Sequence, residues 1–263
     1  MGTKFSTRIW VSVVGIASIF LGSKGYADTV ISVADFGLKP DTRENAVAYV
    51  QKAIEACRGK EPVTLVFPEG RYDFWPQYAH EKNYYETNTY DVFPKRLAML
   101  FEGLHNITVD GNGSQFVMHD RIQPITVENC DGVTLKNFSI DWDIPLTAQA
   151  RVTKVGSDFF EIGINVLESP YIIEDGKLVF VGEGWKSALG SMIEFESDTH
   201  FVVPGTGDLV LGWNWGDYTA VSPRYGIVRL SRKGGFERYP AEGNWLVLRH
   251  STRDHAGIFI CGS

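Results

Sequence analysis

Two aspartates separated by a single residue, Asp141 and Asp143, are the first candidates for chemistry in this chain. They lie in the segment NFSIDWDIP, where apolar residues such as Trp142 alternate with polar ones, as in a half-buried strand. On such a strand both carboxylates share one face, roughly 6–7 Å apart, and Trp142 points to the other face. Carboxyl groups about 6.5–9.5 Å apart perform inverting glycoside hydrolysis. The alternative is that these aspartates only form hydrogen-bonded turns before Pro145.

A second polar group, the segment RHSTRDH at residues 249–255, separates two apolar stretches. Arg253, Asp254 and His255 offer hydrogen-bond donors and acceptors suited to sugar hydroxyls. Ser251 is not part of a Gly-x-Ser-x-Gly elbow, which argues against a nucleophilic triad. The spacing supplies no third metal ligand, so we expect neither a metal nor another cofactor. These two groups leave the catalytic residues unassigned.

The elements that must position these residues repeat along the chain. The segment HNITVDGNGSQFVM has the same pattern as the segment around Val133 and Leu135: a short strand, a turn rich in Gly and Asn, and another strand. The two patterns are 26 residues apart, and repeats of this length are typical of a stacked β-solenoid. We therefore expect Val109, Val133 and Leu135 to point into the interior of such a solenoid.

A helix and a change of pattern complete the predicted fold. Asp41, with Glu44 three residues later, predicts a helix over residues 42–58 that caps the first strands. From about residue 145 to 245, alternating strands separated by hairpin signals predict a small antiparallel β-barrel or sandwich. The predicted class is an all-β right-handed parallel β-helix (solenoid) with an N-terminal capping helix and an inserted antiparallel β-barrel. Its predicted divisions are residues 28–144 for the first coils, 145–245 for the insert and 246–263 for the return to the β-helix.

The two ends of the chain carry their own predictions. Lys4 and Arg8 precede an apolar run and a small-residue cleavage site at Ala27, so residues 1–27 predict a signal peptide and a secreted or periplasmic protein. The alternative is an N-terminal membrane anchor; after removal of the segment we expect no membrane insertion. The last strand, residues 258–263, stops in an open edge, which predicts that the chain is the N-terminal part of a longer protein. A complete protein with that edge covered in an oligomer is the alternative, and the oligomeric state is not determined.

Charge and cysteine content restrict the partners. The formal net charge is −7, and the predicted signal segment contains only basic charges, so the mature chain is more acidic still. An acidic surface argues against a nucleic-acid partner. Cys57, Cys130 and Cys261 lie among apolar neighbours without metal-ligand spacing and are expected to be buried thiols.

Several segments resemble known families. The opening VADFGLKPDTRENAVAYVQKAIEAC, followed by VTLVFPEGRYDF and HNITVDGNGSQFV, resembles pectin-lyase-like right-handed β-helix proteins. Within that superfamily, FGLKPDTRENAV, NFSIDWDIPLTAQARV and LRHSTRDHAGIF are similar to glycoside hydrolase family 110. That family comprises bacterial exported α-1,3-galactosidases, including enzymes that remove the terminal galactose of blood-group B antigens. The resemblance implies an inverting, metal-independent exo-glycosidase with catalytic carboxylates beyond Ser263.

Two classes of function therefore stay open. The first is a glycosidase, or its N-terminal part, acting on a glycan with terminal α-galactose. The second is a non-catalytic β-helix protein that binds glycans. Among enzymes, a polysaccharide lyase or polygalacturonase-like protein is the runner-up, although lyases require a carboxylate cluster for Ca²⁺ that the sequence does not show. The expected substrate-contacting residues are Asp141, Asp143, Arg253, Asp254 and His255.

Overall fold

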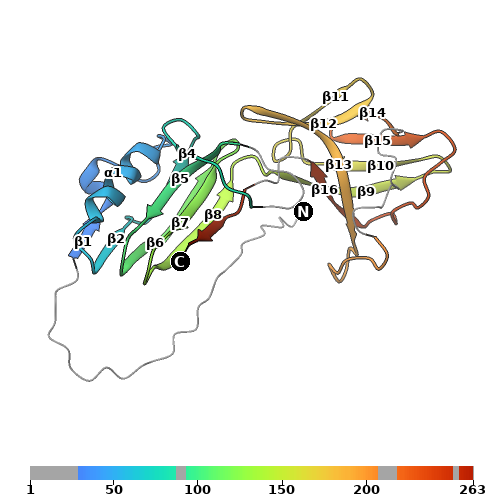
Figure 1. Ribbon diagram of the computed structural model, residues 1–263. Helices are drawn as coiled ribbons and strands as arrows, with labels where there is room; N and C mark the ends of the chain where they lie inside the picture. Colours follow the sequence, from blue (N-terminus) through green and yellow to red (C-terminus); the bar gives the residue numbers. More distant parts are fainter. Residues whose placement is uncertain (1–28, 87–92, 207–217, 251–254, 263) are drawn as a thin grey trace.

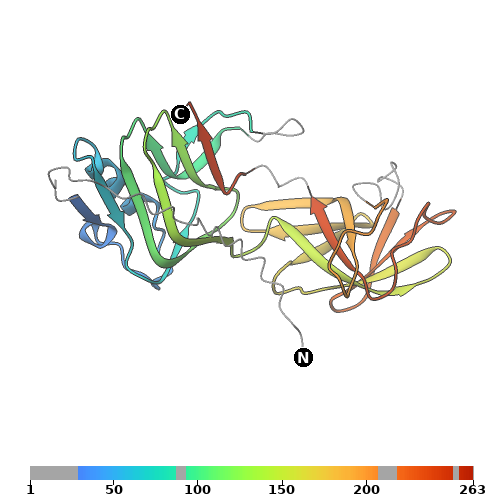
Figure 2. The same ribbon diagram turned by 90° about the horizontal axis from the view of Figure 1, so that it is seen from below.

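The computed structural model describes residues 29–86, 93–206, 218–250 and 255–262. The predicted signal peptide lies outside these residues. Among them no helix is long and apolar enough to cross a membrane. The described chain forms a parallel-strand unit and an antiparallel barrel, which lie side by side (Figures 1 and 2).

The parallel-strand unit consists of two sheets and the helix α1. In the first sheet, the long strand β6 pairs with β2 along its first half and with β3 along its second half, and β8 lies on its other side. In the second sheet, β5, β7 and β17 are parallel, and β4 is antiparallel to β5. The strands of this unit are β1 (Thr29–Ser32), β2 (Val63–Val66), β3 (Arg71–Phe74), β4 (His80–Lys82), β5 (Lys95–Glu102), β6 (Ile107–Met118), β7 (Gln123–Glu128), β8 (Thr134–Trp142) and β17 (Ile258–Cys261).

The helix α1, Val47–Cys57, covers the end of this unit that lies away from the barrel (Figure 1). It begins five residues later than predicted, because Asp41 adopts a positive φ of 61° and accepts a hydrogen bond from the Arg71 N–H instead of capping the helix. The side chain of Asn45 accepts from the Val47 N–H in its place. The apolar stripe of α1 is buried, as the sequence pattern predicted.

The core of the parallel-strand unit is aromatic at its centre. The Phe116 ring lies 4.7 Å from Phe67, 5.8 Å from Phe74 and 5.0 Å from Phe138, measured between ring centroids. Val109 is fully buried, and Val133 and Leu135 are half-buried against the same core. Cys57 and Cys130 are buried free thiols, as predicted, whereas Cys261 is partly exposed.

The barrel contains the largest sheet, with eight antiparallel strands in the order β11-β12-β13-β16-β9-β10-β15-β14. The first and last strands approach each other, because the Ala220 N–H of β14 donates to the Gly176 carbonyl before β12 over 2.7 Å. Its interior is apolar, with Phe160, Phe180 and Trp185 among the buried residues. Its strands are β9 (Thr147–Val155), β10 (Phe159–Ile164), β11 (Tyr171–Glu174), β12 (Lys177–Gly182), β13 (Trp185–Phe195), β14 (Tyr218–Arg224), β15 (Ile227–Arg232) and β16 (Trp245–His250).

The predicted right-handed parallel β-helix is wrong. The structure is all-β, but its parallel strands belong to two sheets of five and four strands, the second of which also contains the antiparallel β4. The dominant sheet is the eight-stranded antiparallel one. The strand β16, which the sequence analysis placed after the barrel, pairs with β13 and β9 inside it. Period-2 alternation specifies which face of a strand is buried but does not specify the neighbouring strand, so the pairing of Trp245 in β16 with Phe195 and Arg151 could not be read from the local pattern.

Candidate functional site

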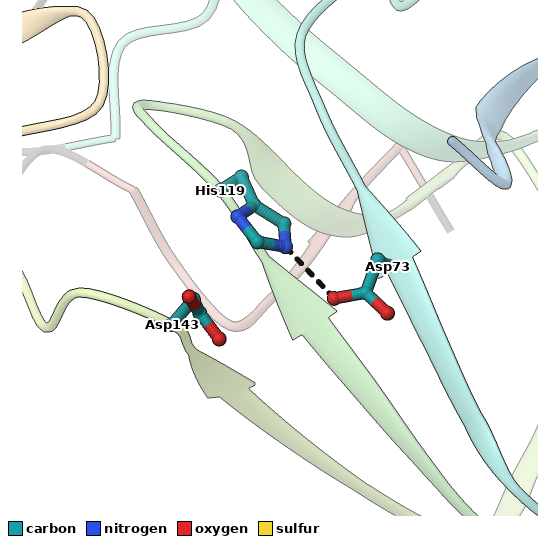
Figure 3. A group of neighbouring side chains, drawn as sticks. All are labelled: Asp73, His119 and Asp143. Atoms are coloured by element: carbon teal, nitrogen blue, oxygen red, sulfur yellow. Dashed lines mark hydrogen bonds and ion pairs between the residues drawn. The ribbon is translucent and has the colours of Figure 1, made fainter. Parts of the chain in front are cut away.

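Three polar residues meet where β3, β6 and β8 end (Figure 3). The register places Phe74, Met118 and Trp142 side by side. The parallel pairing continues one residue further, since the His119 N–H donates to the Phe74 carbonyl over 2.9 Å and the Asp143 N–H to the Met118 carbonyl over 3.0 Å. As a result, side-chain oxygen or nitrogen atoms of Asp73, His119 and Asp143 lie within 4.8 Å of one another.

Arg71 joins the two aspartates. Its Nη2 lies 2.5 Å from Asp73 Oδ1 and 2.7 Å from Asp143 Oδ1, and its Nε donates to both Asp73 oxygens over 3.0 Å. Arg43 Nη1 adds a weaker contact to Asp143 at 3.5 Å. Burial by itself would raise the pKa of Asp73, but the hydrogen bonds from Arg71 and His119 outweigh it and lower that pKa. Burial by itself would also raise the pKa of Asp143. The hydrogen bond from Arg71 and the positive charges of His119, Arg71 and Arg43 outweigh burial and lower that pKa.

His119 is hydrogen-bonded through both ring nitrogens. Nε2 lies 2.8 Å from Asp73 Oδ1, and Nδ1 lies 2.6 Å from Oε2 of Glu183, which is carried by the turn between β12 and β13 of the barrel. Ionised carboxylates only accept hydrogen bonds, so both contacts are satisfied when each ring nitrogen carries a proton and the ring is an imidazolium. The Trp75 ring stacks on this ring at 3.7 Å and 11°. Such a stack stabilises a cationic ring.

The aspartates and the histidine have the side-chain types of a metal site, but both Asp73 oxygens, both His119 ring nitrogens and Asp143 Oδ1 already take part in hydrogen bonds. Asp73 Oδ1 accepts from Arg71 and His119, and Asp143 Oδ1 accepts from Arg71. A divalent cation at these oxygens would lie beside a guanidinium that is always charged. The residues therefore fit an ion-pair network and do not fit a metal ion.

The same network does not provide the acid and base of an inverting hydrolase. Asp73 and Asp143 have oxygen atoms within 4.8 Å of each other, closer than the spacing of about 6.5–9.5 Å that accommodates a water. Both carboxyls have lowered pKa values and are ionised at neutral pH, so neither can donate a proton as a general acid. The arrangement is suited to fixing carboxylate oxygens that accept hydrogen bonds from a ligand.

The structure separates the residues that the sequence analysis grouped. Asp143 belongs to the cluster, whereas Asp141 is exposed and accepts a hydrogen bond from the Trp142 N–H over 2.8 Å. Trp142 is half-buried against the core of the parallel-strand unit, on the side that alternation predicted. Arg253 and Asp254 lie outside the described residues.

The two histidines of the 249–255 segment, His250 and His255, lie in different surroundings. Burial, assisted by the charges of Lys95 and Arg121, lowers the pKa of His255 to about 4, so this ring is neutral. Its Nδ1 is buried and has no hydrogen-bond partner within the described part of the chain. His250 lies inside the barrel, with its ring centroid 5.0 Å from that of Trp185, and burial lowers its pKa to about 4. His250 is thus part of the barrel core.

The residues that sequence reasoning missed are Arg71, Asp73, His119 and Glu183. The repeat of 26 residues describes the first half of β6, where Asp110 pairs with Lys136, but a bulge changes the offset to 24 residues, so that Met118 pairs with Trp142. Gly111 permits the bulge, since a Cβ there would lie 2.5 Å from Phe138 Cβ. The Gly-Asn-Gly segment at residues 111–113 was the sequence signal for this bulge. Without the change of register, His119 would not lie beside Asp143.

Acid should weaken the fold through this network. The lowered pKa values of Asp73 and Asp143 stabilise the folded state fully above their ordinary pKa of 3.8, and this contribution is lost as the pH falls through the lower folded values. We expect the urea midpoint to fall between roughly pH 4 and pH 2. The Asp73→Asn variant removes one of the two carboxyls and should show a flatter decline over that range; an equally steep decline in both proteins would contradict the assignment.

One family model matches the barrel, and several curated proteins are similar to most of the chain. Residues 148–246 match the family model described as GLAA-B beta-barrel domain I, which coincides with the antiparallel barrel. The chain is 58% identical over 236 residues, 89% of its length, to a protein of Bacteroides thetaiotaomicron named "Alpha-1,3-galactosidase B". It is 34% identical over 90% of its length to "Alpha-1,3-galactosidase A" of Bacteroides fragilis, and 30% identical over 90% of its length to "Alpha-1,3-galactosidase B" of Akkermansia muciniphila.

The similarity covers most of this chain but only part of each relative. The chain spans 38% of the length of the two Bacteroides proteins and 29% of that of the Akkermansia protein. In both of its units, the parallel strands and the barrel, this chain is similar to part of the bacterial proteins named alpha-1,3-galactosidase.

Proposed function

We propose that this chain, alone or as the N-terminal part of a longer protein, acts in an exported exo-glycosidase. The reaction is hydrolysis of terminal α-1,3-linked galactose from glycans such as blood-group B structures, with inversion and without a metal. The observation that carries the proposal is the identity of 58% over 89% of the chain to a protein named for that activity. The matched barrel family model supports the same assignment.

The site supports recognition of a sugar rather than its cleavage. Asp143 has a side chain 37% exposed and is held ionised by Arg71, so it can accept hydrogen bonds from sugar hydroxyls. Arg43, 59% exposed, offers donors beside it. Because neither aspartate of the cluster can act as the acid, the catalytic carboxylates of the proposed hydrolase belong to another part of the protein.

A glycan-binding protein without catalysis is the second candidate. It is favoured by one observation: the described cluster holds a fixed, ionised carboxylate and no protonated one. Binding requires only such acceptors and donors, whereas inverting hydrolysis also requires an acid. Turnover therefore decides between the two candidates.

The test is galactose release from the B-type trisaccharide and from a nitrophenyl α-galactoside. The 263-residue chain and the full product of its gene are assayed in parallel, and proton NMR identifies the anomer released first. We expect β-galactose from the full product and no release from the 263-residue chain alone. Absence of release from the full product would refute the hydrolase, and rapid turnover by this chain would place the acid and base within it.

Asp143→Ala should weaken turnover of the galactoside by the full gene product by about tenfold or more, because a hydrogen-bonded charged acceptor contributes roughly 1.5–3 kcal/mol. The melting temperature should change little, since the Asp143 side chain is partly exposed. The matched control is Asp141→Ala, which removes an exposed aspartate two residues away. Equal losses of activity in the two variants, or unfolding of Asp143→Ala, would show that Asp143 is structural.

A further inference from the structure

The barrel contributes a carboxylate to the cluster at the end of β3, β6 and β8. Glu183 lies in the turn between β12 and β13, and its side chain is 39% exposed. It reaches the parallel-strand unit through His119, as described above. The next residue, Gly184, has a φ of +72°, and a Cβ there would lie 2.4 Å from Asp120 Oδ2, so the turn is in close contact with the residue after His119.

The charges of the cluster balance. Asp73, Asp143 and Glu183 supply three negative charges, while Arg43, Arg71 and the doubly hydrogen-bonded His119 supply three positive ones. A net neutral cluster gives no electrostatic advantage to a charged ligand of either sign. A neutral ligand with several hydroxyl groups can use its acceptors and donors alike.

Two carboxylate oxygens, each on a partly exposed side chain of the cluster, have no hydrogen-bond partner within the described residues. One is Asp143 Oδ2 and the other is Glu183 Oε1, since the contacts of these two side chains involve Oδ1 and Oε2. Both carboxylates are fixed from behind: Asp143 by Arg71 and Glu183 by His119, which is itself held by the buried Asp73. Acceptors that are already fixed bind hydroxyl groups with little loss of side-chain entropy.

We propose that Glu183 contacts the ligand in the same site as Asp143, that His119 positions Glu183, and that the ligand is a neutral polyhydroxy compound such as a galactoside. The site is then complete only when the barrel is docked on the parallel-strand unit. This inference rests on the proposed function for the choice of galactose, and it assigns the barrel a direct role in binding.

The experiment is titration of the ¹⁵N-labelled chain with methyl α-galactoside, followed by NMR shifts of backbone amides around His119 and Gly184. We expect saturable shifts in the wild type and a dissociation constant at least about tenfold higher in Glu183→Gln. The matched control is Glu174→Gln, an exposed barrel glutamate that is paired with Lys186 at 3.0 Å, and its binding should match the wild type. Gly184→Ala keeps every charge but displaces the turn, and should weaken binding too.

The positioning role of His119 has its own readout. In His119→Gln, binding of the galactoside should be weaker, because Glu183 loses the ring that fixes its Oε2. Adding Glu183→Gln to that variant should then raise the dissociation constant much less than Glu183→Gln does in the wild type. A purely structural histidine would alter stability and leave the effect of Glu183→Gln on binding unchanged.

Three outcomes would overturn the inference: no saturable shift in the wild type, unchanged binding in Glu183→Gln, or tighter binding of sodium galacturonate than of the neutral galactoside. Each leaves the galactosidase proposal intact, because galactose release from the full gene product tests that proposal separately. Conversely, saturable binding of the galactoside without any release by the full product would retain the site and refute the hydrolase.

Discussion

Asp73→Ala is expected to lower the free energy of unfolding by about 3–5 kcal/mol, the cost of removing one partner from a buried ion pair. The Asp73 side chain is fully buried and accepts hydrogen bonds from Arg71 and from His119. Without it, the His119 ring, only 2% exposed, loses the carboxylate that compensates its charge. Urea denaturation at pH 7, with the slope checked for unchanged two-state behaviour, measures the effect.

The control for this prediction is Asp141→Ala. Asp141 lies on the neighbouring strand β8 at an exposed position, so its removal should change stability by less than about 0.5 kcal/mol. If Asp73→Ala were as mild as the control, the network would contribute nothing net to the fold. The close contacts of Arg71 would then be incidental.

Phe116→Ala should destabilise the chain by about 3–5 kcal/mol, as large-to-small substitutions of buried aromatic residues do. The Phe116 ring is fully buried among Phe67, which follows β2, Phe74 of β3 and Phe138 of β8. The cavity left by the substitution cannot collapse without moving the strands that carry the site. Thermal and urea unfolding measure the loss of stability.

Phe201→Ala in the barrel is the comparison for Phe116→Ala, because Phe201 is 72% exposed and should cost little. A loss in Phe116→Ala below about 1 kcal/mol would show that the aromatic centre is loosely packed. Since Phe116 lies on β6 two residues before its end at Met118, the variant should also disturb the hydrogen bonds of His119.

Local patterns in the sequence specified the individual elements. The apolar stripe of α1, the alternation in β8 and the hairpin signals of the barrel each depend on residues near in sequence, where the periods of 3.6 and 2 determine which side chains are buried. The exposure of Asp143, directly after β8, followed from the same alternation. These features could be predicted because they require no knowledge of distant partners.

Only the tertiary structure determined which strands pair and which distant side chains meet at the site. The bulge at Gly111 places His119 in register with Asp143. The strand β16 pairs within the eight-stranded antiparallel sheet, instead of forming part of the solenoid that the repeat predicted. Glu183, 64 residues beyond His119, arrives only because the barrel docks against the turn that follows β6. A repeat length gives an average offset, whereas the register of a sheet and the docking of two units depend on long-range packing that no local period encodes.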